Sequence, residues 1–200
     1  MKDERSLSEV ANSFMITEVA GGMHGKLLEY LNKTVKKMVD YHKSRGQSLS
    51  KTTILELVRN EHYEHLFAIQ AAKNGNVSKG SVRVQKEDMG GTKLCFKNAM
   101  EYVKKNGGEV AFGIGIDPPD YDRFFKITDD QKAMRTKLFG TTHAFVVKDG
   151  KVIDPTWGKD NAWYFYGIVP KSTWKKMTPS QLQTWIYRTI KKAPIPKLLY

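Results

Sequence analysis

Three side chains in the second half of the sequence have the types needed for nucleophilic chemistry: the thiol of Cys95, the imidazole of His143 and the carboxylate of Asp154. Cys95 is the only cysteine, and it follows Thr92, whose hydroxyl is suited to cap a helix with apolar residues three and four apart. The spacing predicts that Cys95 is about the fourth residue of that helix. Backbone N–H groups there lack helical partners and favour an anion, which makes a thiol more nucleophilic. Free cysteines are also commonly buried apolar residues, so position alone leaves both interpretations open.

A predicted hairpin relates His143 to Asp154. Two strands, 141–148 and 151–154, flank Asp149-Gly150, a pair typical of a two-residue hairpin turn. Pairing about this turn places the side chains of His143 and Asp154 on one face as diagonal neighbours. Asp154 can then accept a hydrogen bond from the imidazole and fix its tautomer. A slip of one residue in the turn would put the two side chains on opposite faces.

These residues resemble a known family. Cys95 at the head of a helix, His143 followed by Ala144, and the stretch Asp154-Pro155-Thr156-Trp157 are similar to the transglutaminase-like branch of the papain-like cysteine proteins. The resemblance covers residues 89–170. It implies a cysteine helix packed on an antiparallel sheet, with Cys95 as nucleophile, His143 as general base and then acid, and Asp154 as the residue that orients the histidine. Family members include peptidases, amidases, transglutaminases and other acyltransferases.

Supporting residues are less clearly indicated. Many family members carry a tryptophan or glutamine shortly before the cysteine to hold the oxyanion, but residues 89–94 contain neither. Gln85 is the nearest candidate, and the backbone N–H of Cys95 is a second donor. Asn98, one helical turn after the cysteine, either braces the site or lies on the surface, and Trp157 is a further supporting candidate.

The rest of the chain predicts an α+β fold with helices first and an antiparallel sheet after them. Residues 23–43 and 51–73 have the apolar spacing of helices, and no strand is indicated before residue 80. Later strands are predicted at 109–116, 141–148, 151–154 and 162–169, and the capping-box pattern Thr178-Pro179-Ser180-Gln181 opens a final helix. We therefore expect a helical extension or subdomain at 1–80 and a transglutaminase-like core with a basic C-terminal helix at 81–200.

Composition sets further limits. The 200 residues are 40% hydrophobic, which is ordinary for a globular protein. A single cysteine cannot form an internal disulfide, so the disulfide-rich secreted class is excluded and a reducing compartment is favoured. We see no apolar run near the roughly 20 residues of a membrane span, and the charged N-terminus lacks the apolar stretch of a signal peptide. These features predict a cytoplasmic protein.

Charge indicates where a partner could bind. The formal net charge is +12, and residues 171–200 hold seven basic residues and no acidic one. This segment either binds an acidic partner or nucleic acid or simply keeps its lysines in water. His62 and His65 offer half of a metal site at most, so we expect no metal and no cofactor.

The sequence therefore predicts a thiol-dependent enzyme that hydrolyses a peptide or amide bond in a protein or other amide-bearing substrate. Two alternatives remain open at this stage. In one, an amine replaces water and the protein is a transglutaminase-type acyltransferase. In the other, the protein is a non-catalytic binding module that uses its basic C-terminal surface.

Overall fold

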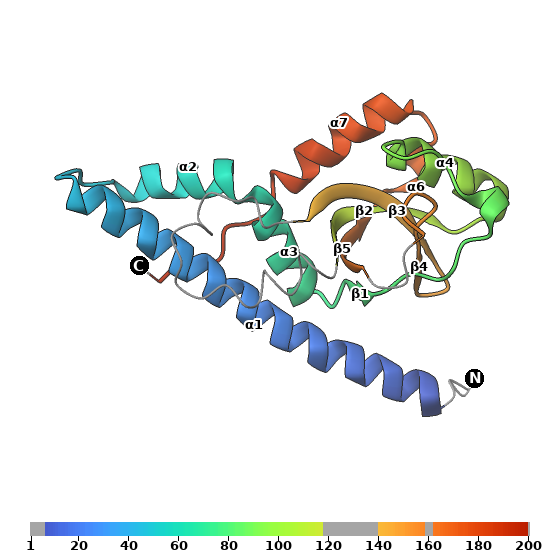
Figure 1. Ribbon diagram of the computed structural model, residues 1–200, viewed down its shortest axis with the longest axis horizontal. Coiled ribbons are helices and arrows are strands. Elements are labelled where there is room, and N and C mark those ends of the chain that lie inside the picture. Colours follow the sequence, from blue (N-terminus) through green and yellow to red (C-terminus); the bar gives the residue numbers. More distant parts are fainter. Residues whose placement is uncertain (1–6, 118–139, 159–161, 200) are drawn as a thin grey trace.

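The computed structural model describes residues 7–117, 140–158 and 162–199, with side chains placed from residue 22 onward. Its helices and single antiparallel sheet confirm the α+β class (Figure 1). No helix in these ranges is both long and apolar enough to cross a membrane. The elements in chain order are α1 (Leu7–Ser44), α2 (Lys51–Glu61), α3 (Tyr63–Lys73), β1 (Val77–Lys79), η1 (Lys86–Asp88), α4 (Cys95–Asn106), β2 (Glu109–Ile116), β3 (Thr141–Lys148), β4 (Lys151–Ile153), β5 (Trp163–Ile168), α6 (Lys171–Trp174) and α7 (Pro179–Ile190).

The sheet has five strands in the order β1-β5-β2-β3-β4, and each neighbouring pair is antiparallel. The predicted hairpin register is confirmed, because Val147 pairs with Val152 across the turn. Asp149 and Gly150 both have positive φ, 51° and 71°, as a two-residue turn of this hand requires. On the other side of β3, His143 pairs with Gly113 of β2. The candidate histidine therefore lies on an interior strand.

Helices cover one face of the sheet. Phe112 of β2 contacts Phe67 of α3 and Trp185 of α7, with ring centroids 5.5 Å apart in both pairs. α3 lies between the sheet and α1. Leu27 and Leu31 of α1 are completely buried. The opposite face carries a smaller cluster made of Ala111, Phe145, Val147, Val152, Ala162 and Tyr164.

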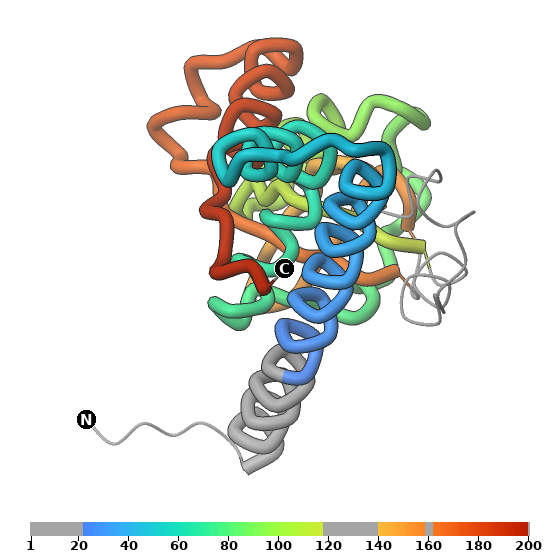
Figure 2. Tube along the Cα trace, turned by 90° about the vertical axis from the view of Figure 1, so that its left-hand side faces the viewer, coloured from blue at the N-terminus to red at the C-terminus, as the bar shows by residue number. Residues whose placement is uncertain are grey.

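The chain after α7 returns across the N-terminal helices. Arg59 of α2 donates Nη1 to the carbonyl oxygen of Lys191 at 3.0 Å, and the backbone N–H of Leu199 donates to Oδ1 of Asn32 at 2.8 Å. Ala193, between these contacts, is buried. Figure 2 shows the C-terminal residues in red beside α1. The C-terminal residues of the described chain thus pack on α1 and α2, and the expected division at residue 80 stays a prediction.

Three local predictions were wrong. The helix expected from Thr92 begins at Cys95, because Lys93 has a φ of 64°, which a right-handed helix does not tolerate. The helix expected over 51–73 is two helices, since the backbone of His62 leaves helical geometry. A strand does precede residue 80: β1 is too short for a pattern and exists through its pairing with β5.

Three elements match their sequence signals closely. The capping box at the start of α7 is present, with Thr178 accepting from the backbone of Gln181 and the Gln181 side chain accepting from Thr178. The strands expected at 109–116 and 141–148 are β2 and β3 with the same bounds.

Close packing at Gly113 generates a stability prediction. A Cβ at this position would lie within van der Waals overlap of the backbone of Phe165 and 2.9 Å from Cα of Tyr166. We expect Gly113→Ala to lower the free energy of unfolding by about 1–3 kcal/mol, because the neighbouring strand backbone cannot yield freely. Gly25→Ala in α1, where nothing lies within 4 Å, should instead raise it by about 0.5–1 kcal/mol. Urea unfolding measures both, and equal effects would contradict the packing described.

Candidate active site

Cys95 is the first residue of α4, nearer the helix start than its sequence predicted. No side chain caps this end of the helix, and Leu94 supplies its carbonyl oxygen to the N–H of Asn98 at 2.8 Å. The left-handed turn at Lys93 aims the chain into the helix immediately before the thiol. At this first position, the backbone N–H groups of the opening turn are not used within the helix, so they are available to an anion. Cys95 itself is 8% exposed.

His143 joins the thiol to the carboxylate. Its Nε2 lies 2.8 Å from Oδ2 of Asp154, so the contact predicted from the hairpin is present. The imidazole also lies within hydrogen-bonding reach of the Cys95 side chain. Because Nε2 is engaged by Asp154, Nδ1 is the ring nitrogen that remains for the sulfur. The structure therefore brings the three residues together in the order thiol, imidazole, carboxylate.

Asp154 is fully buried immediately after β4, and both of its oxygens accept hydrogen bonds. Oδ1 accepts from the backbone N–H groups of Thr156 and Trp157, each at 2.9 Å. Oδ2 accepts from the Tyr164 hydroxyl at 2.8 Å as well as contacting His143. A buried carboxylate without such donors would be very costly, so this network keeps it ionised and fixed in position.

Sequence reasoning missed Tyr164 as a site residue. It lies on β5, which pairs with β2 and not with the hairpin, so no local turn relates it to Asp154. The sequence could have predicted the backbone N–H donors of Thr156 and Trp157, because an aspartate commonly accepts hydrogen bonds from N–H groups two and three residues further on. The stretch Asp154-Pro155-Thr156-Trp157 fits that pattern.

Electrostatics favour a charged histidine. Burial by itself lowers the pKa of His143, but hydrogen bonds and charge from Asp154 and Cys95 outweigh this and raise the pKa to about 9. Burial likewise raises the pKa of Asp154, and the contacts from His143 and the two backbone N–H groups overcome it, so that the pKa is lowered. Burial, followed by the adjacent carboxylate, raises the pKa of Tyr164, which therefore stays a proton donor. At neutral pH the site holds an imidazolium between two groups able to carry negative charge.

Trp157, a supporting candidate from the sequence, shields the histidine. Its indole stacks on the imidazole with ring centroids 4.3 Å apart and an interplanar angle of 18°. Gly115 on β2 leaves room for the indole, because a Cβ on Gly115 would come within 2.8 Å of the Trp157 ring. His143 is 2% exposed, and the stacked indole restricts rotation of the imidazole.

Asn98 braces the loops on either side of the site, as one of the two interpretations of the sequence predicted. Its Nδ2 donates to the carbonyl oxygen of Gly91 at 2.8 Å and to Oγ1 of Thr156 at 2.9 Å. The loop before Cys95 is thereby tied to the loop after Asp154. Gln85, the other supporting candidate, does not join this network. It is exposed, and within the described residues its side chain makes no hydrogen bond.

The described residues contain no cluster of three or more His, Cys, Asp or Glu side chains that could hold a metal ion. His65 is instead fully buried, and its Nε2 lies 3.0 Å from the carbonyl oxygen of Leu27. It connects α3 to α1 and is a structural residue.

The raised pKa of His143 predicts a pH-dependent stability. A group whose pKa is higher in the folded than in the unfolded protein stabilises the fold fully below its unfolded value, here 6.5, and loses that contribution as pH rises through about 9. We therefore compare the thermal midpoint of the native protein with that of the His143→Gln variant. We expect the advantage of the native protein to shrink as the pH rises from 6.5 through about 9. Burial lowers the pKa of His65 to about 3, so this histidine does not titrate there. A constant difference between the two proteins would contradict a charged His143.

The double hydrogen bond of Asn98 gives a second prediction. Asn98→Ala leaves two acceptors without their donor, and we expect it to lower the free energy of unfolding by about 1–3 kcal/mol. Asn98→Asp keeps the shape but cannot donate when ionised, so it should be at least as destabilising as alanine. Denaturant unfolding measures both variants. An Asn98→Asp protein as stable as the native one would show that the amide donor is unimportant.

Comparison with known proteins adds no relative to this picture. The chain matches no protein-family model, no curated protein and no solved structure. The similarity of residues 89–170 to the transglutaminase-like cysteine proteins therefore remains a prediction, supported by the thiol–imidazole–carboxylate arrangement described above.

Proposed function

We propose that this protein is a thiol-dependent acyl-transfer enzyme that hydrolyses peptide or amide bonds, in the manner of the transglutaminase-like cysteine enzymes. One observation carries the proposal: the buried imidazole of His143 lies within hydrogen-bonding reach of the only thiol of the chain and lies 2.8 Å from a buried carboxylate. A structural cysteine needs neither contact. Nucleophilic catalysis needs both, because the base must reach the nucleophile and must itself be held in place.

The first half of the reaction would form a thioester. Cys95, as a thiolate beside the imidazolium of His143, attacks the carbonyl carbon of the substrate, and the carbonyl oxygen takes up the electron pair. The backbone N–H of Cys95, at the uncapped start of α4, would donate to that oxygen. The intermediate then collapses: the carbon–nitrogen bond breaks, the imidazolium gives its proton to the leaving nitrogen, and an amine departs.

The second half would release the acyl group. The neutral imidazole of His143 takes a proton from water, whose oxygen attacks the thioester carbon. Collapse of this intermediate breaks the carbon–sulfur bond, frees a carboxylic acid and restores the thiolate–imidazolium pair. If an amine enters in place of water, the same steps produce a new amide, which is the transferase alternative.

The surrounding residues would serve the histidine. Asp154 fixes the tautomer and stabilises the imidazolium, as a carboxylate does in other triads. Tyr164 and two backbone N–H groups hold that carboxylate, and Trp157 holds the plane of the ring. The thiol is thus served by a base whose orientation is determined by several independent contacts.

Alkylation by iodoacetamide tests the proposal, because Cys95 is the only cysteine and every modification reports on it. We expect the folded native protein to react between pH 6 and 7, where an ordinary thiol, with a pKa of about 8.5, is mostly protonated. His143→Gln should slow the reaction at least about tenfold at these pH values, since the positive partner of the thiolate is removed.

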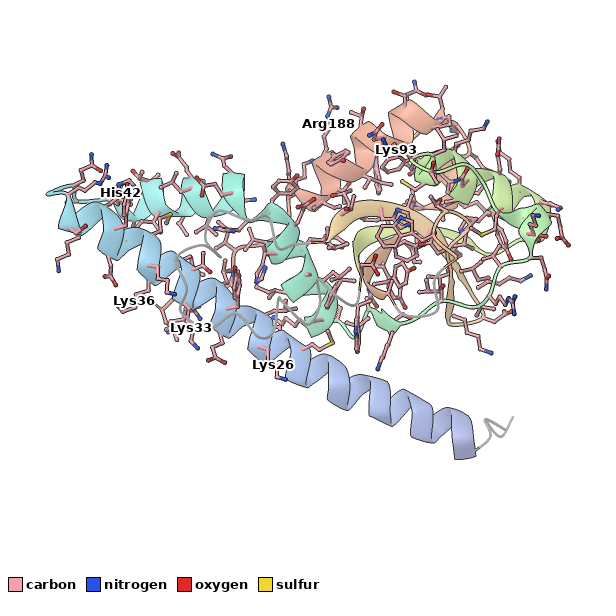
Figure 3. The ribbon with its side chains drawn as sticks, viewed as in Figure 1. Lys26, Lys33, Lys36, His42, Lys93 and Arg188 are labelled. Carbon is pink, nitrogen blue, oxygen red and sulfur yellow. The ribbon has the colours of Figure 1, made fainter. Side chains whose placement is uncertain are left out.

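A matched control separates this effect from a general loss of histidine. His42, at the far end of α1 in Figure 3, is partly exposed and contacts Gln47 at 2.7 Å, so His42→Gln should leave the alkylation rate unchanged. Native protein that reacts only above pH 8, or reacts equally fast after His143→Gln, would refute the catalytic proposal.

A further inference from the structure

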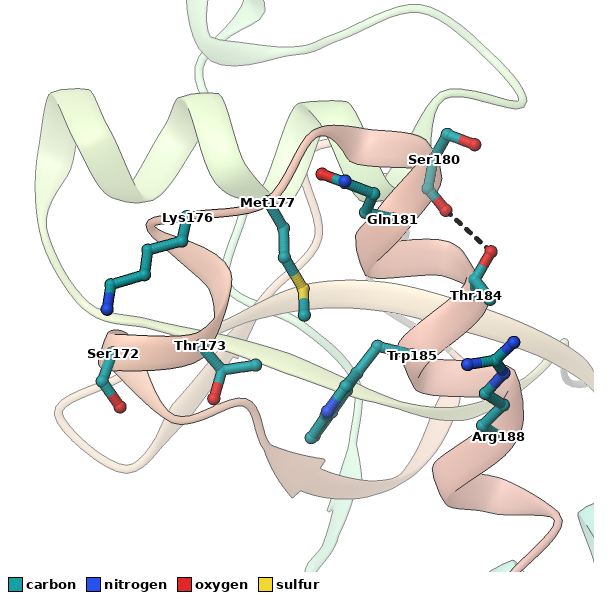
Figure 4. A pocket seen from close by; sticks show the side chains of 9 residues that line it. All are labelled: Ser172, Thr173, Lys176, Met177, Ser180, Gln181, Thr184, Trp185 and Arg188. Atoms are coloured by element: carbon teal, nitrogen blue, oxygen red, sulfur yellow. Dashed lines mark hydrogen bonds between the residues drawn. The ribbon is translucent and has the colours of Figure 1, made fainter.

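A groove separate from the candidate triad lies between α6 and α7. It has a volume of about 560 Å³ and is formed by the short α6, the turn that follows it and the outer face of α7 (Figure 4). We call it the α6–α7 groove. The residues that line it are Ser172, Thr173, Lys176, Met177, Ser180, Gln181, Thr184, Trp185 and Arg188.

The groove has a cation on each side and no carboxylate in its lining. Figure 4 shows Lys176 on the side of α6 and Arg188 on α7, with the floor between them. Both side chains belong to exposed residues. The whole segment 171–200 contains no aspartate or glutamate, so no acidic residue of this segment neutralises them. The charge of the groove therefore suits an anionic ligand.

The floor of the groove is apolar. Met177 and Trp185 are half-buried and lie between the two polar sides. Trp185 is anchored from below, where its ring meets that of Phe112 edge-on at 80°. A fixed aromatic floor with flanking hydroxyls and cations is the composition of a recognition site for an apolar group that carries charges beside it.

We propose that the α6–α7 groove binds an acidic segment of a polypeptide. An apolar side chain of that segment packs on Trp185 and Met177, and carboxylates on either side of it pair with Lys176 and Arg188. Arginine meets a carboxylate with two parallel hydrogen bonds. The hydroxyls of Ser180 and Thr184 lie on α7, the helix that carries Arg188. This binding does not require the thiol, so it goes beyond the proposed acyl-transfer activity.

A nucleic-acid strand fits these observations less well. Proteins that bind nucleic acid through its backbone obtain most of their affinity by neutralising many phosphates, and single strands are held on successive exposed aromatic faces. The groove offers two cations and one indole, half-buried and already packed on Phe112. An acidic peptide needs no more than two cations and one apolar floor.

Fluorescence anisotropy on the full chain tests this proposal. The probe is a short fluorescein-labelled peptide of alternating glutamate and leucine, and its comparison peptide has glutamine in place of glutamate. We expect saturable binding of the glutamate peptide that weakens with added salt, and at least about tenfold weaker binding of the glutamine peptide. The double variant Lys176→Ala with Arg188→Ala should lose at least about tenfold in affinity as well.

The matched control removes the same charge from the same segment. Lys175 and Lys192 are exposed and do not line the groove, so Lys175→Ala with Lys192→Ala should change the affinity by less than about twofold. Equal losses in the two double variants would indicate a diffuse charge effect and overturn the proposal. The absence of saturable peptide binding, or tighter binding of a labelled oligothymidylate than of the glutamate peptide, would overturn it too.

Discussion

The buried pair of His143 and Asp154 imposes the constraint that the rest of the site satisfies. An ionised carboxylate with no exposed surface is stable only where donors surround it. Here a tyrosine hydroxyl, two backbone N–H groups and the imidazole supply those donors. The carboxylate in turn allows a buried imidazole to keep its proton, and the raised pKa of His143 follows from this arrangement. Each partner makes the burial of the other possible.

Strand geometry places the pair, and small residues make room for it. The turn at Asp149-Gly150 sets the register that brings β3 and the end of β4 together. On the neighbouring strand, glycine at position 115 leaves space for the indole of Trp157 to lie on the imidazole. The helix α4 then supplies the thiol from its first residue. The site is therefore an outcome of sheet register more than of any single loop.

The sequence was informative where local rules determine the structure. A two-residue turn and side-chain alternation were enough to place His143 beside Asp154, and the capping box at Thr178 marked the start of α7. The sequence was uninformative where a contact depends on segments that are far apart in the chain. Tyr164 reaches Asp154 only because β5 pairs with β2, and the space at Gly115 depends on a ring from another segment. The start of α4 was misplaced because Lys93 adopts a left-handed backbone, which its residue type does not signal.

The proposed chemistry requires Cys95 to accept an acyl group with the help of His143. Intact-mass spectrometry after brief incubation with a p-nitrophenyl ester of a small acyl group, quenched in acid, measures this directly. We expect one added acyl mass, located on Cys95 by peptide mapping and removed on further incubation with water or an added amine. The added mass should be lost in Cys95→Ala and greatly reduced in His143→Gln. An adduct on another residue, or equal acylation of the native protein and His143→Gln, would contradict it.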